Sequence, residues 1–162
     1  MEPYRFQSAR ELFECAREAS RDAERIRRQL EAMESRALSL GGGSFEPRVS
    51  STPTGGTMER RVGALIDMEG RLRERQEDDY ALMDFACSVL YGGDGDAGLW
   101  ALVGWRADAL WHHYLGGRTW AATGVLLGYT EQHVWREAQV ALDVCDAWGI
   151  ADVMRGRGNA TD

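Results

Sequence analysis

The chain has 162 residues, of which 44% are hydrophobic and 28% are charged, and its formal net charge is −7 at pH 7. This composition is typical of soluble globular proteins and excludes a disordered chain, and the longest apolar runs are far shorter than the roughly 20 residues of a membrane-spanning helix. The acidic balance disfavours general attraction to nucleic acid, because phosphate binding usually requires a basic face.

The cysteines and the N-terminal residues indicate the cellular compartment of the protein. Cys15, Cys87 and Cys145 are odd in number and widely spaced, which favours free thiols in a reducing compartment over a disulfide framework. The first 36 residues carry charges throughout and lack the apolar run of a secretory signal. We therefore predict a cytoplasmic protein with no membrane partner. All 19 basic residues are arginine, which we attribute to codon bias.

A heptad pattern dominates residues 6–40. One seven-residue series comprises Ala9, Ala16, Ala23, Leu30 and Ala37, and a second comprises Leu12, Ala19, Ile26, Met33 and Leu40. This a/d spacing predicts a long amphipathic helix whose alanine-rich seam packs closely on a partner helix. Arginine and glutamate fill the other positions, so we interpret the remaining face as solvated. A phosphate-binding role for Arg21, Arg25 and Arg28 is the alternative.

Residues 41–57 are rich in glycine and proline and predict a loop. A second long helix is expected to begin near Thr57 as N-cap. Its apolar residues at three- and four-residue spacing are Met58, Val62, Leu65, Leu72, Met83, Ala86 and Leu90. Residues 1–91 therefore predict a long helical hairpin or, equally, an intermolecular coiled coil that makes a homo-oligomer through the N-terminal helices. The sequence does not distinguish these two arrangements.

An acidic and glycine-rich stretch follows. Residues 92–96 predict a turn with Asp96 as a helix cap, since Asp94 and Asp96 lack the downstream ligands of a calcium loop. Residues 76–105 contain six acidic side chains and no basic one. This surface is expected to repel DNA.

Residues 92–148 predict a helix-turn-helix domain. An apolar helix face from Leu99 is expected to end at Gly116 and Gly117. Thr119 is positioned to cap a short helix over residues 120–127, which ends at Gly128, and Thr130 to cap a second helix. The expected buried side of that second helix is Val134, Ala138, Ala141, Leu142 and Cys145.

The spacing around the turn has a physical reason. Gly124 permits close approach of the two helices, and Gly128 can adopt a positive φ at little cost. Leu127 and Val134 would fill the wedge between the helices. The outward residues of the second helix are then Glu131, Gln132, His133, Trp135, Arg136 and Gln139.

The motifs of this helix-turn-helix region resemble those of a known protein family. This region resembles the C-terminal module of the ArpU/RinA-type phage regulators. The resemblance rests on the motif Tyr114-Leu115-x-Gly117-x-Thr119-Trp120, followed by Leu127-Gly128-Tyr129-Thr130, Val134-x-Arg136 and Ala141-Leu142. Those regulators are in turn similar to the sigma-factor region that reads the −35 promoter element. The loop Val49–Pro53 between two long helices resembles the family's N-terminal half, so the likeness covers most of residues 5–148. His113 replaces a usually basic residue, and Thr123 a usually aliphatic one.

The resemblance implies a transcription regulator of a phage or prophage, acting on double-stranded promoter DNA in a bacterial host cell. Carried over by position, Gln132, His133 and Arg136 would contact base edges. Three residues near the two helix N-termini would contact phosphates, namely Arg118, Thr119 and Thr130. Arg136 could instead pair with an acid one turn away, and Gln132 and His133 could be solvated surface. Partner contacts are expected at Trp135, Glu131 and Gln139, since an exposed tryptophan favours an interaction surface.

The sequence does not favour an enzyme. His112, His113 and His133 lack the spacing and the further ligands of a metal site, because adjacent histidines on a helix point about 100° apart. We therefore predict no catalytic residue, metal or cofactor. Residues 149–162 are expected to form a flexible tail.

Three functions are compatible with this organisation. The first is a late or packaging-gene activator that reads promoter DNA with the helix after Thr130. The second is an acidic protein-interaction module that docks on host RNA polymerase or another regulator without binding DNA tightly. The third is a DNA-packaging component like a small terminase subunit. The expected fold is the same for all three: all-α, with a long N-terminal hairpin or coiled coil followed by a helix-turn-helix domain.

Overall fold

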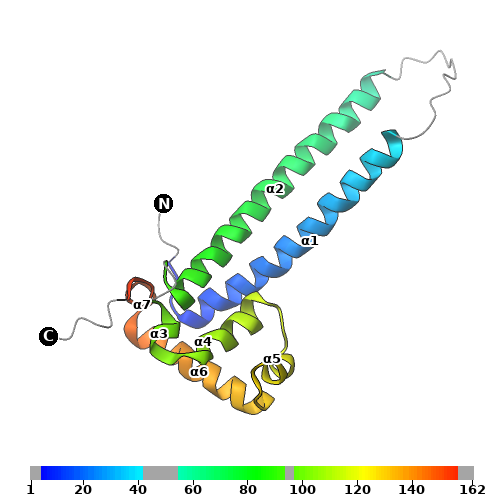
Figure 1. Cartoon of the computed structure of the whole chain (residues 1–162). Coiled ribbons are helices and arrows are strands. Elements are labelled where there is room, and N and C mark those ends of the chain that lie inside the picture. Colours follow the sequence, from blue (N-terminus) through cyan, green and yellow to red (C-terminus); the bar gives the residue numbers. More distant parts are fainter. Residues whose placement is uncertain (1–4, 42–54, 94–96, 157–162) are drawn as a thin grey trace. The chain divides into compact units, whose positions relative to one another are not determined.

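The computed structural model describes residues 5–41, 55–93 and 97–156, and every regular element in them is helical (Figure 1). The elements in chain order are α1 (Ala9–Gly41), α2 (Gly55–Tyr91), α3 (Leu99–Val103), α4 (Trp105–Leu110), the π-helical turn η1 (Trp111–Leu115), α5 (Trp120–Leu127), α6 (Glu131–Trp148) and α7 (Ile150–Arg155). The all-α prediction is confirmed. Within these ranges, none of the helices combines the length and the apolar character that crossing a membrane requires.

The chain divides into two compact units. Unit 1 combines residues 1–21 with residues 79–162, and unit 2 is the intervening Asp22–Asp78. Unit 1 therefore contains the beginning of α1, the end of α2 and all later helices. The sequence placed the change of organisation near residue 91, whereas the packing assigns the base of both long helices to the same unit as α3–α7.

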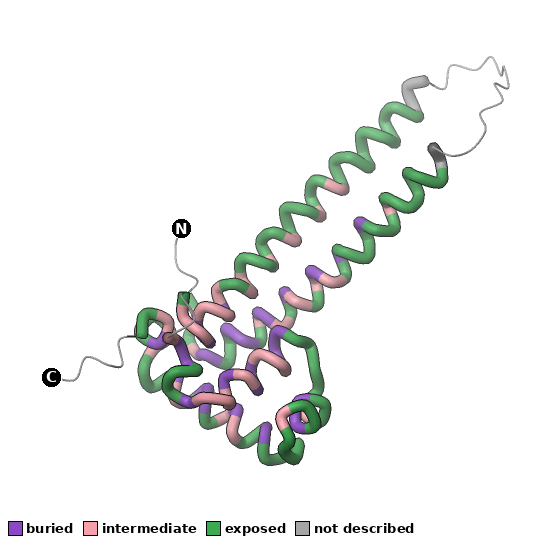
Figure 2. Tube along the Cα trace, in the orientation of Figure 1, coloured by how far each residue is buried: buried purple, intermediate pink, exposed green. Residues whose placement is uncertain are grey.

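The core of unit 1 joins segments that are far apart in sequence. Ala9, Leu12 and Phe13 of α1 are fully buried together with Leu90 of α2 and Leu142 of α6, and the tube in Figure 2 marks buried residues on each of these helices. The ring of Phe13 packs on that of Tyr114 with centroids 5.8 Å apart. The heptad positions at the start of α1 thus contribute to the core of the C-terminal helices, not only to a hairpin seam.

In unit 2, the segments of α1 and α2 run antiparallel to each other (Figure 1). Arg75 forms an ion pair with Asp22 at 2.5 Å, and the side-chain amide of Gln76 donates to the carbonyl oxygen of Ala23 at 3.4 Å. The two long helices therefore pair within one chain. Arg25 and Arg28 pair with acids of their own helix, which agrees with a solvated face.

Unit 2 leaves several large apolar side chains exposed. They are Leu38, Met58, Val62, Leu65, Ile66 and Met68, each at least 48% exposed. Unit 2 does not bury this surface by itself, and the homo-oligomer expected from the N-terminal helices remains a prediction.

Three expectations about helix boundaries are corrected. The apolar face from Leu99 to Gly116 is not one helix, because the chain turns at Gly104 with φ +61°, which divides α3 from α4. Gly98, not an aspartate, precedes the first residue of α3. Asp96 lies outside the described residues.

The start of α2 also differs from the expected one. Thr57 lies inside α2, which begins at Gly55, and the loop residues 42–54 are outside the described residues as well.

The expectation of a flexible tail over residues 149–162 is wrong for its first part. Residues Ile150–Arg155 form α7, in which Val153 is 2% exposed and belongs to the core of unit 1. Ile150 and Met154 pack on the same core. These three apolar side chains at three- and four-residue spacing supply the burial that fixes the segment. Residues 157–162 are outside the described part.

Candidate nucleic-acid interface

Two capped helices meet in the predicted place. The hydroxyl of Thr119 accepts a hydrogen bond from the backbone N–H of Ala122 at 3.1 Å and begins α5. The hydroxyl of Thr130 accepts one from the backbone N–H of His133 at 3.3 Å and begins α6. Each cap satisfies an N–H that has no partner inside its helix. Both helix beginnings predicted from the sequence are confirmed.

The turn between these helices depends on two glycines. Gly128 ends α5 with φ +80° and ψ +28°, a left-handed conformation that glycine adopts readily. The N–H of Tyr129 then bonds to the carbonyl oxygen of Gly124 at 2.9 Å. A Cβ atom on Gly124 would lie 2.7 Å from the carbonyl oxygen of Tyr129. The predicted close approach at Gly124 is therefore confirmed.

The wedge between α5 and α6 is apolar with one satisfied hydroxyl. All five residues expected on the buried side of α6 are at most 1% exposed, while Leu127 is only half-buried. Thr123, which stands where the resemblance expects an aliphatic residue, is fully buried, and its hydroxyl donates to the carbonyl oxygen of Thr119 at 2.9 Å. That bond removes the cost of burying the hydroxyl, so the substitution leaves the packing of α5 intact.

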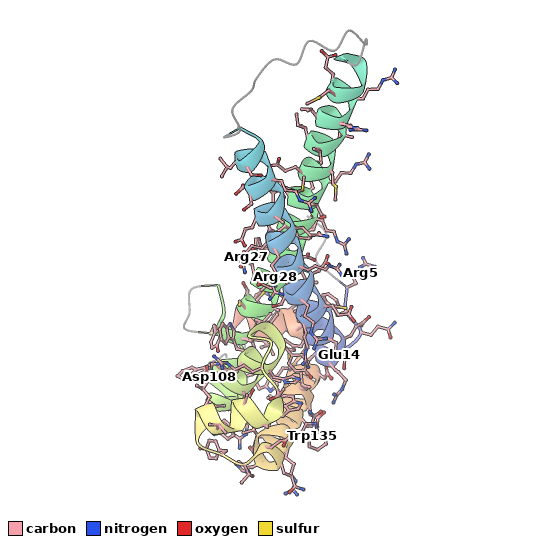
Figure 3. All side chains as sticks on the ribbon, turned by 90° about the vertical axis from the view of Figure 1, so that its right-hand side faces the viewer. Arg5, Glu14, Arg27, Arg28, Asp108 and Trp135 are labelled. Carbon is pink, nitrogen blue, oxygen red and sulfur yellow. The ribbon has the colours of Figure 1, made fainter. Side chains whose placement is uncertain are left out.

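The predicted contact residues lie on the outer surface of this pair of helices. Exposed side chains are those of Arg118, Thr119, Thr130, Glu131, Gln132, His133, Trp135 and Arg136, whereas Gln139 is half-buried. Trp135 projects from α6 and is 48% exposed (Figure 3). An open groove of about 430 Å³ at the start of α6 is lined by Trp120, Thr130, Glu131, Gln132 and Trp135. The structure thus brings part of the predicted set together at one groove.

The members of this set differ in how they are held. The imidazole of His133 lies against the rings of Tyr129 and Trp105, with centroid distances of 5.1 and 5.9 Å. The side chain of Gln139 accepts a hydrogen bond from Arg10 of α1. Arg136 forms no ion pair within the described residues, so the pairing considered for it one turn away is not observed.

The acidic residues of this region lie mostly in internal contacts. Asp108 accepts a hydrogen bond from the hydroxyl of Tyr91 at 2.7 Å, Glu137 pairs with Arg106, and Asp146 accepts the backbone N–H of Ala9 at 2.6 Å. Three of the five acids between residues 106 and 148 are therefore used to hold α4 and α6 against the base of α1 and α2. The other two acids, Glu131 and Asp143, are exposed on α6 and form no ion pair within the described residues.

A buried histidine joins α1 to this surface, and the sequence did not single it out for that role. His113 is 6% exposed, its ring stacks on that of Trp120 with centroids 3.6 Å apart, and its Nε2 lies 2.5 Å from Nη1 of Arg17. Because a guanidinium can only donate, Nε2 must be the acceptor and the imidazole must be neutral. Burial, and next the charge of Arg17, lower the pKa of His113 to about 4.

We expect this neutral histidine to make the protein sensitive to acid. The folded pKa of about 4 lies below the value of 6.5 for a free imidazole, so the unfolded chain binds more protons between these two pH values. Stability is then lost as the pH falls from about 6.5 toward 4. Between pH 7 and pH 5, the free energy of unfolding of His113→Gln is expected to fall by about 2 kcal/mol less than that of the parent, as measured by urea unfolding. Equal losses in the two proteins would contradict the assignment.

The described residues contain no group of three or more histidine, cysteine or carboxylate side chains placed to hold a metal ion. His112 and His113 diverge on η1, where His112 packs edge-on against Trp111. Comparisons with protein-family models, with curated proteins and with solved structures gave no match.

Proposed function

We propose that this protein is a DNA-binding transcription regulator of a phage or prophage, of the ArpU/RinA type, that reads promoter DNA with α6. The proposal rests on the resemblance of the motifs between Tyr114 and Leu142 and on the geometry of α5 and α6. A capped helix, a glycine turn and a second capped helix form the layout in which the second helix enters the major groove.

The observation that carries the proposal is the free outer face of α6. Gln132 and Arg136 are exposed one turn apart and make no side-chain hydrogen bond within the described residues. An amide and a guanidinium are the groups that bond in pairs to adenine and guanine edges, respectively. The N-termini of α5 and α6, with Thr119 and Thr130 as caps, supply N–H groups suited to phosphates.

The net charge of −7 disfavours DNA binding less than its value implies, because several acidic side chains are engaged in contacts inside the protein. Asp108, Glu137 and Asp146 are engaged in contacts within unit 1. The exposed arginines Arg118 and Arg136 form no ion pair within the described residues. The beginning of α6 therefore carries less net negative charge than the average over the chain implies.

The direct test is selection of DNA from a random duplex library with the full chain, repeated with Arg136→Ala and Gln132→Ala. We expect the parent to select one sequence, and each variant to lose preference at one or two positions, at a cost of about 1–3 kcal/mol per lost base contact. Glu59→Ala, an exposed change in unit 2, is the matched control and should select the parental sequence. If both α6 variants also select the parental sequence, α6 does not read the bases.

A second candidate is a module that docks on host RNA polymerase or another regulator. Exposed Trp135 beside the groove at the start of α6 favours it, because half-exposed tryptophans are frequent at protein interfaces. The same purified protein separates the two functions. Retention of polymerase on the immobilised chain, with no enriched DNA sequence and no duplex binding at low salt, would replace the first proposal by this one.

A further inference from the structure

A second groove of unit 1 lies beside the start of α1. It measures about 410 Å³ and is open to solvent. Arg10, Arg17 and Arg21 of α1 line one side, and Trp120, Trp135 and Gln139 of α5 and α6 line the other. Trp120 and Trp135 line this groove and also the groove at the start of α6. We call it the α1 groove.

The arginines of the α1 groove form a line. Positions 10, 17 and 21 are separated by seven and four residues, so at about 100° per residue they lie within about 20° of one line along α1. Glu14 and Glu18 also line the groove and lie about 40° and 80° to one side of Arg10. The groove thus has an excess of positive charge, concentrated along the line of the arginines, in a chain that is acidic overall.

Contacts within unit 1 fix two of these arginines in place. Arg10 donates to the side chain of Gln139 on α6, and Arg17 donates to buried His113, which stacks on Trp120. The hydroxyl of Ser20 donates to the carbonyl oxygen of Leu115 at 3.0 Å and ties α1 to the end of η1. Arg21 is exposed and forms no ion pair within the described residues. Glu14 and Trp135, which both line the groove, lie on the same side of unit 1 (Figure 3).

We propose that the α1 groove binds the phosphate backbone of the duplex whose bases α6 reads, with Arg21 as the principal phosphate contact and Arg10 and Arg17 beside it. The inference rests on the proposed function. A backbone strand that passes the N-terminus of α5 reaches Trp120 first and then the arginines of α1. The exposed indole of Trp135 can pack on deoxyribose, and the guanidiniums can bond to phosphate oxygens.

Phosphate contacts in the α1 groove would compensate for the small number of free arginines in the helix-turn-helix segment. Between residues 106 and 148 there are three arginines, and Arg106 is already paired with Glu137. The start of α1 belongs to the same unit and adds three further arginines next to α6. Phosphate neutralisation, which supplies most of the sequence-independent affinity of DNA-binding proteins, is therefore shared between α1 and the two capped helix ends.

The test measures how the affinity of the full chain for two fluorescent duplexes depends on salt. One duplex carries the selected sequence and the other a scrambled one. Arg21→Ala should weaken binding to both duplexes by the same factor and reduce the slope of log K against log salt by about 0.9, the value for one released counterion. The double variant Arg10→Ala/Arg21→Ala should reduce the slope by about 1.8. Arg136→Ala should instead weaken binding to the selected duplex more than to the scrambled one.

Arg27→Ala is the matched control, because it makes the same change in net charge on the same helix, about 100° away from the line of the groove arginines. Its slope should equal that of the parent. Melting followed by circular dichroism, which reports on the helices of both units, verifies that each variant is folded. An Arg21→Ala slope equal to the Arg27→Ala slope, while the parent still prefers the selected duplex, overturns the α1 groove and leaves the reading role of α6 in place. A parent that binds neither duplex at low salt overturns both proposals.

Discussion

Phe13→Ala is expected to destabilise unit 1 by about 3–5 kcal/mol, the range for removal of a fully buried aromatic side chain. Phe13 is 0% exposed and packs on Tyr114, although it lies in the long N-terminal helix. All six tryptophans lie between residues 100 and 148, in unit 1, so tryptophan fluorescence during urea unfolding reports on this unit. The fluorescence midpoint should move to markedly lower urea.

Val125→Ala is the control for this experiment, because Val125 of α5 is 84% exposed. Its effect should lie within about 0.5 kcal/mol. If Phe13→Ala changed the fluorescence midpoint no more than Val125→Ala does, the start of α1 would not be part of the core that supports α5 and α6. The separate hairpin domain expected over residues 1–91 would then describe the chain better than the two units do.

Gly124→Ala is expected to have the second-largest effect, a loss of about 1–3 kcal/mol, as for overpacking in a closed site. The added Cβ would lie 2.7 Å from the carbonyl oxygen of Tyr129 and 3.2 Å from the backbone nitrogen of Glu131. Neither neighbour is a flexible side chain, so relief requires α6 to move relative to α5. We therefore expect the unfolding midpoint and the DNA affinity to fall together, measured by urea unfolding followed by circular dichroism and by duplex binding.

Gly63→Ala provides the matched comparison. Gly63 lies within α2, and a Cβ there would have nothing within 4 Å. Alanine should stabilise the helix by about 0.5–1 kcal/mol, because glycine loses more backbone entropy on folding. Opposite signs at the two glycines are the signature of a steric turn at position 124. A stabilising effect at both would show that α5 and α6 do not approach closely in solution.

Local signals in the sequence are strong for the helix-turn-helix. Thr119 and Thr130 as caps, Gly128 as the left-handed end of α5 and the buried face from Val134 to Cys145 all follow from short-range spacing, and the structure confirms each of them. These features depend on backbone hydrogen bonds and φ preferences within a few residues. Such interactions are nearly independent of the rest of the chain, which is why they could be predicted.

The boundaries that were missed depend on distant neighbours. Val153 folds into α7 because core side chains from other helices bury it, and a short polar-looking segment before a glycine-rich end gives little local indication of this. The break at Gly104 likewise divides a continuous apolar pattern that reads locally as one helix. In both places tertiary packing overrides local periodicity.

The amino-acid pattern alone predicts helices throughout, the beginnings of the two capped helices and the buried face of α6. The packed structure is needed to see that the first turns of α1 belong to the same core as α5 and α6, and that Arg17 contacts His113, 96 residues away in the chain. This difference follows from the range over which the interactions act. Caps and periodicity act between residues one or two turns apart, whereas the side of α1 that faces α6 depends on how both helices pack on Phe13, Leu142 and the other core residues.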